Sequence, residues 1–162
     1  MYESLIFFLF LLIVVVIHFT LAPLIQILGV GPDIILIYLV YWSVRRESYK
    51  GVIAGFVGGI IQDLVQATIM GIYSLSKSIA CFFAGYIMRN KKSIPFILLI
   101  FTLFITVFIH QMIYSVFTSL HSAGGYLSLV LRYLIPSSFY TMVVGVAVYG
   151  SIELWKKKKR GD

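Results

Sequence analysis

Three charged residues lie in segments that are otherwise apolar: Asp63, Lys77 and Arg132. In a lipid environment such charges are costly unless they are paired or hydrated. At about 1.5 Å of helix rise per residue, all three are expected roughly 6–10 Å below the same membrane surface. The short connection around 67–70 should also pack the helices that carry Asp63 and Lys77 as an antiparallel pair. We therefore predict a salt bridge between Asp63 and Lys77, with Arg132 as a second partner or as part of a polar pocket.

Other polar residues are candidates for lining a groove: His18, Gln62, Gln66, Thr106 and His110. The two histidines are expected somewhat deeper than the charged residues, about 13 Å from the same surface. Polar side chains also recur every four residues along one helix, at Thr102, Thr106, His110, Tyr114 and Thr118. Hydrogen bonding between helices is the common role of such a stripe. A wet cavity is the alternative.

The sequence contains no pattern typical of an enzyme or a metal site. H-E-x-x-H, G-x-S-x-G and C-x-x-C motifs are absent, as are paired carboxylates on one helix. No histidine has a partner histidine, cysteine or aspartate at i+3 or i+4. Serines flank Lys77 at Ser76 and Ser78, but serines on an apolar helix are ordinarily unactivated. We predict no catalytic activity, no metal and no cofactor.

The composition indicates that the elements carrying these residues are membrane helices. The chain has 162 residues, of which 60% are hydrophobic and 12% charged, with a mean hydropathy of +1.00. Soluble domains carry about 25% charged residues, so this chain has too few to cover a water-soluble surface. We expect an all-α membrane protein forming one integral membrane domain. Its six or so spans are expected at about 4–27, 32–44, 51–66, 71–88, 94–119 and 127–153.

The net charge of +7 is concentrated in three segments, which together hold eleven of the thirteen Lys and Arg residues. With six spans, these segments fall on one side of the membrane, and the positive-inside rule places both termini in the cytoplasm. The charge thus reports orientation and not nucleic-acid binding. The basic tail, residues 156–162, is expected to attract anionic lipid at about 1 kcal/mol per residue, with a cytoskeletal contact as the alternative. Its cations are Lys156, Lys157, Lys158, Lys159 and Arg160.

Glycines spaced four residues apart lead to Asp63 along the third predicted helix, at Gly51, Gly55 and Gly59. A ridge without side chains lets another helix backbone approach closely. The same pattern suits a helix of this chain and a helix of another protein.

Three motifs resemble a known family. They are GPDIIL at the start of the second span, the GxxxGFxxGIIQD run of the third, and MGIYSL after it. Together with the chain's size, they resemble MreD, the rod shape-determining membrane protein. The resemblance implies a subunit of the bacterial elongation machinery in the cytoplasmic membrane. The implied partners are chiefly MreC, with RodA, a class B penicillin-binding protein and MreB in the same complex.

Two functions follow from the resemblance. The first is a non-enzymatic scaffold that holds MreC and shapes an extracytoplasmic groove. The second is a ligand-binding membrane subunit of a vitamin-type transporter, because MreD-like chains are similar in fold to the substrate-binding subunits of energy-coupling-factor transporters. Those subunits dock through small residues on their first span. The first span here, LIFFLFLLIVVVIHFT, is bulky throughout, which favours the scaffold.

Overall fold

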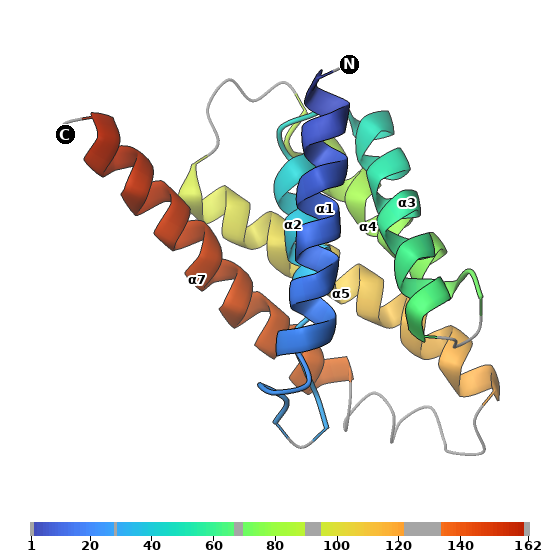
Figure 1. Cartoon of the computed structure of the whole chain (residues 1–162). Helices are drawn as coiled ribbons and strands as arrows, with labels where there is room; N and C mark the ends of the chain where they lie inside the picture. The colour runs from blue at the N-terminus through green and yellow to red at the C-terminus, as the bar shows by residue number, and fades with distance from the viewer. Residues whose placement is uncertain (1, 28, 67–69, 90–94, 122–133, 161–162) are drawn as a thin grey trace.

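A computed structural model of the chain describes residues 2–27, 29–66, 70–89, 95–121 and 134–160. Regular structure in these residues is helical, apart from an isolated β-bridge between Ile27 and Val30, which confirms the all-α prediction. The helices are α1 (Tyr2–Leu21), α2 (Ile34–Ser43), α3 (Ser48–Gln66), α4 (Ile72–Ile87), α5 (Phe96–His121) and α7 (Ile135–Arg160). Successive helices run in opposite directions, so that the N-terminus and the C-terminal end of α7 both lie in the upper part of Figure 1.

The observed helices correspond to the six predicted segments, with differences at two ends; the predicted start of the last segment, at residue 127, lies outside the described residues. The first was expected to continue to residue 27 but ends at Leu21. Pro23 follows closely, and a proline disfavours helical geometry in the residue before it. The last was expected to end at residue 153, but α7 continues to Arg160. Lysine is a good helix former, so the basic run extends the helix.

Among the described residues, two stretches are long and apolar enough to cross a membrane, Phe96–Ser119 in α5 and Ile135–Ile152 in α7. Shorter apolar stretches are Leu5–Leu21, Ile34–Ser43 and Ile72–Ile87. Large apolar side chains of α1 are exposed along much of the helix, including Leu5 (69%) and Val16 (65%). Exposed apolar side chains of this kind suit contact with lipid or with another apolar helix.

The short helix α2 lies at the centre of the packing. Its residues Ile35 and Leu39 join a cluster with apolar side chains of α1, while Leu36 and Val40 join a second cluster with α4, α5 and α7. The Tyr149 hydroxyl on α7 donates a hydrogen bond of 2.9 Å to the backbone oxygen of Ile37. Because α2 is buried on both sides, it fixes the positions of the helices around it.

The glycine ridge of α3 packs against α4. A Cβ built on Gly51 would lie 2.9 Å from the Cys81 carbonyl oxygen, and one on Gly55 would lie 2.5 Å from the Lys77 carbonyl oxygen. At Gly59 a Cβ would overlap the backbone of Ser74. The ridge is therefore used for packing inside this chain, and it sets the backbones of α3 and α4 unusually close.

Candidate functional site

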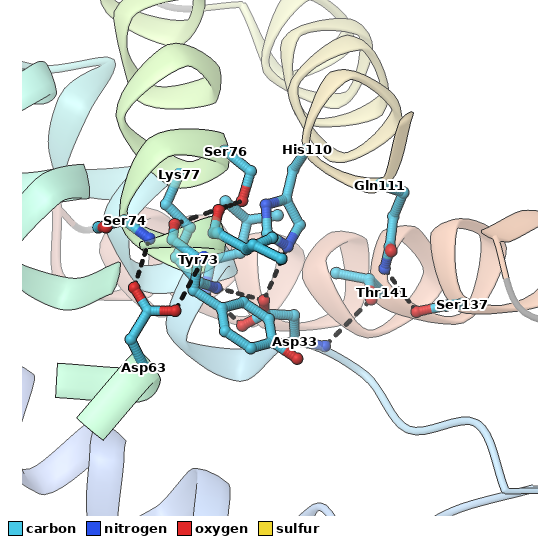
Figure 2. A network of polar contacts seen from close by, with 12 residues as sticks. Asp33, Asp63, Tyr73, Ser74, Ser76, Lys77, His110, Gln111, Ser137 and Thr141 are labelled. Carbon is cyan, nitrogen blue, oxygen red and sulfur yellow. Dashed lines mark hydrogen bonds and ion pairs between the residues drawn. The ribbon is translucent and has the colours of Figure 1, made fainter. Parts of the chain in front are cut away.

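Asp33 is the centre of a buried polar cluster formed with Lys77, His110 and Thr141, which we call the Asp33 cluster (Figure 2). One carboxylate oxygen of Asp33 pairs with the Lys77 ammonium and lies 3.4 Å from His110 Nε2. The other accepts the Leu36 N–H at 2.8 Å and so caps the start of α2. The Asp33 N–H donates to the Thr141 hydroxyl at 3.1 Å. The cluster thus joins α2, α4, α5 and α7.

The ion pair differs from the predicted one, which was between Asp63 and Lys77. The Asp63 carboxylate instead accepts the N–H groups of Tyr73 and Ser74, each at 3.0 Å (Figure 2). These two N–H groups lie in the first turn of α4, where a helix has no backbone partner for them. The N-cap residue of α4, Gly71, contributes no side-chain hydrogen bond. A helix start attracts a carboxylate through its unpaired N–H groups and its dipole. Asp63 therefore caps α4, and the Lys77 ammonium is paired with Asp33.

The GPDIIL motif places Asp33 at the start of the second predicted span and carries no signal of a contact with Lys77. Asp33 does stand at the start of α2, where it is the N-cap. The depth of Asp33 in the membrane could have indicated the pair, because Asp33 begins a helix at the end of the bundle where α3 ends and α4 begins. The third member of the predicted charged cluster, Arg132, lies outside the described residues.

A cavity of about 420 Å³ adjoins the Asp33 cluster, and we call it the polar pocket. It lies between the C-terminal ends of α1 and α3, the connection before α2, the start of α4, and parts of α5 and α7. Four of the predicted groove residues line it, namely His18, Gln62, Gln66 and His110. The fifth does not: the buried Thr106 hydroxyl donates at 2.8 Å to the Thr102 carbonyl of its own helix. A threonine that bonds back to its helix has no donor left for a groove.

Aromatic rings form one wall of the polar pocket. The rings of Tyr73 and Tyr114 stack with their centroids 5.0 Å apart, and the His110 ring stacks on Tyr73 at 6.2 Å. On the α5 side, the Gln111 amide donates to the Ser137 hydroxyl of α7 at 2.6 Å. The two tyrosines, Gln111 and Ser137 were not among the predicted groove residues.

The described residues do not assemble a nucleophile with a base. The hydroxyls of Ser76 and Ser78 donate to backbone carbonyls of α4, at 2.7 and 2.6 Å. The Lys77 ammonium is engaged by Asp33. Within the described part of the chain, no group of three or more His, Cys, Asp or Glu residues could hold a metal ion.

Basic residues gather at the other end of the bundle. Arg45 follows α2, and its guanidinium lies 3.7 Å from the centroid of the Tyr41 ring. Hydrogen bonds with Tyr49 and Lys50 lower the pKa of the exposed Glu47 carboxyl. In the basic tail the Lys158 side chain is exposed, and the side chains of Lys156, Lys157, Lys159 and Arg160 lie outside the described residues.

Comparison with known protein families gives one match. The family model for the rod shape-determining protein MreD matches residues 1–158. The chain belongs to the MreD family. No curated protein and no solved structure gives a significant match to this MreD family member.

The MreD match includes the residues described above. The Asp33 cluster, the Asp63 cap, the glycine ridge of α3 and the polar pocket all lie within residues 1–158. Both the packing of α3 on α4 and the pocket beside it therefore belong to the part of the chain that the family defines.

Proposed function

We propose that this chain is a non-enzymatic scaffold subunit of the bacterial cell-elongation complex, in which it binds MreC during peptidoglycan synthesis. RodA, a class B penicillin-binding protein and MreB are the other expected members of the complex. The match to the MreD family over residues 1–158 is the observation that carries the proposal.

The helix packing supports a scaffold role. The closely packed α3 and α4, and the polar links from Asp33 to four helices, give a frame that resists distortion. The exposed apolar side chains of α1 offer a surface for partner helices or lipid. A scaffold needs these two properties, a stable frame and an apolar contact surface.

We further propose that the chain passes through the cytoplasmic membrane six times, with the short α2 crossing together with the connection before it, and that both termini lie in the cytoplasm. The start of α1 and the end of α7 lie at one end of the bundle, together with the loop between α2 and α3 (Figure 1), which carries Arg45 and Arg46. In this orientation the basic tail meets the anionic inner leaflet. Truncation after Trp155 should leave MreB localisation unchanged. Displaced MreB would instead indicate a cytoskeletal contact.

The test is depletion of the protein in a rod-shaped host, combined with affinity purification of a tagged copy. Depleted cells should become round, and the tagged copy should retain MreC after solubilisation in mild detergent. The control is an unrelated six-span protein with the same tag and expression level. Normal cell shape after depletion, together with no enrichment of MreC over the control, would overturn the proposal.

The second candidate is the ligand-binding subunit of a transporter, and the polar pocket is the observation that favours it. Against it stands the bulky exposed surface of α1, which lacks the small residues used for docking in such subunits. Purification separates the two functions. A transporter subunit should retain an ATPase-containing coupling module, whereas a scaffold should retain MreC.

A further inference from the structure

The polar pocket is large enough for a small molecule and has the form of a binding site. Its volume of about 420 Å³ falls in the range of roughly 300–1,000 Å³ that is common for ligand pockets. Its walls come from five helices and the connection before α2. The packed helices hold these walls in place, so a ligand would meet a largely preformed site.

The described walls carry no uncompensated charge. Asp33 is the one carboxylate among the described wall residues, and the Lys77 ammonium neutralises it from behind. No lysine or arginine is among the described residues that line the cavity. A phosphate or carboxylate would lose its hydration there without gaining a cationic partner, which is unfavourable. The described part of the wall therefore gives an uncharged molecule the better fit.

The wall side chains are rich in groups that both donate and accept hydrogen bonds. They include the amides of Gln26, Gln62 and Gln66 and the hydroxyl of Tyr114. Amides and hydroxyls pair best with ligand groups of the same dual character. The stacked rings of Tyr73 and Tyr114 add an aromatic surface on which a flat or ring-shaped group can lie.

Three buried wall side chains have an unpaired polar atom: His110, whose Nε2 contacts Asp33 and whose Nδ1 has no partner among the described residues, and the pair His18 and Gln62. The His18 Nδ1 and Gln62 Oε1 atoms have no hydrogen-bond partner among the described residues, and the two residues are 7% and 2% exposed. An unsatisfied buried polar atom is destabilising. A small rotation of the His18 or Gln62 side chain toward the cavity would allow a ligand hydroxyl or amide to satisfy its unpaired atom.

From these observations we propose that the polar pocket binds an uncharged, ring-shaped molecule bearing hydroxyl or amide groups, of which a sugar ring is the simplest example. The ring lies against Tyr114, and its polar groups bond to Gln62 and Gln66. The sugar can be free or can be the headgroup of a lipid, since both present the same chemistry to the pocket. This inference does not depend on the scaffold function.

The test uses the full chain in nanodiscs, because sugar-headed detergents would compete for the pocket. Binding of N-acetylglucosamine is measured by calorimetry and by ligand-detected NMR. Glucosamine and glucose 6-phosphate serve as the cationic and anionic counterparts, each expected to bind at least tenfold more weakly. Dodecyl N-acetylglucosaminide in the nanodisc distinguishes the lipid source, because it should bind more tightly than the free sugar only if the pocket takes a headgroup.

Variants locate the binding in the pocket. Tyr114→Leu, which removes the aromatic surface, and Gln62→Met should each weaken binding about tenfold, whereas Tyr86→Leu, at an exposed tyrosine on α4 outside the pocket, should leave it unchanged. Gln66→Met, on the same wall and less buried, provides a second amide variant if Gln62→Met fails to fold. Circular dichroism confirms folding in each case.

Three results would overturn the proposal. These are no saturable binding of N-acetylglucosamine to the folded protein, equal or tighter binding of the phosphate sugar, and binding that the wall variants leave unaltered. The first outcome would mean that the pocket holds only water. Each result is independent of whether MreC is retained, so the pocket and the scaffold function can fail separately.

Discussion

The pairing of Lys77 with Asp33 predicts strong energetic coupling between two residues that lie 44 positions apart. The perturbations are Asp33→Asn, Lys77→Met and the double variant. Asparagine is also a good N-cap, so Asp33→Asn retains the acceptor for the Leu36 N–H and removes only the charge. Methionine retains most of the apolar length of the lysine side chain.

The magnitude follows from burial. Lys77 is 0% exposed and Asp33 is 8% exposed. Removing one partner of a buried ion pair typically costs about 3–5 kcal/mol, because the other charge remains buried and unpaired. The double variant leaves neither charge behind, so we expect it to recover about 2–3 kcal/mol relative to the sum of the two single variants. The contact of His110 with Asp33 prevents full recovery.

The assay is unfolding in mixed micelles by titration with sodium dodecyl sulfate, followed by far-UV circular dichroism. The matched control is the same cycle with Asp63→Asn in place of Asp33→Asn. Since Asp63 bonds to backbone N–H groups of α4, its coupling to Lys77 should stay below about 0.5 kcal/mol. Additive effects for Asp33 and Lys77, together with coupling of 2 kcal/mol or more for Asp63 and Lys77, would refute the pairing described here.

Three further predictions test the packing, the cap and the topology. Gly55→Ala should destabilise the fold by about 1–3 kcal/mol in the same titration, because its Cβ would meet the α4 backbone. The control is Gly150→Ala, whose Cβ would have its nearest neighbour 3.8 Å away. Equal stability of the two variants would contradict the close packing of α3 on α4. Asp63→Ala should cost about 1–2 kcal/mol by uncapping α4, and unaltered thermal unfolding in detergent would exclude that role. In a cysteine-free chain, Leu24→Cys should react with an impermeant maleimide in intact cells and Glu47→Cys only after permeabilisation; the reverse pattern would invert the proposed orientation.

The helices and their approximate limits could be predicted from the sequence because they depend on local properties. Apolar runs interrupted by polar segments marked all six described helices. The glycine spacing of α3 correctly indicated a close helix contact, because missing side chains permit such contact with any partner. What the spacing left open was the partner, which is α4 of the same chain.

The polar contacts required the tertiary structure. Asp63 and Asp33 are both carboxylates near the same end of the bundle, and Lys77 is compatible with either on sequence alone. The partner of Lys77 depends on which carboxylate accepts hydrogen bonds from the N–H groups in the first turn of α4. They bond to Asp63, while the packing of α2 between α4 and α5 brings Asp33 to Lys77 and His110.

The sequence by itself therefore determined the all-helical class, the helix positions, the concentration of positive charge and the family. Each of these depends on composition and on periodicity within a single segment. Only the tertiary structure decided the ion pair, the cap on α4 and the lining of the polar pocket. Those features depend on distances between atoms of different helices, which hydropathy and spacing along one segment do not contain.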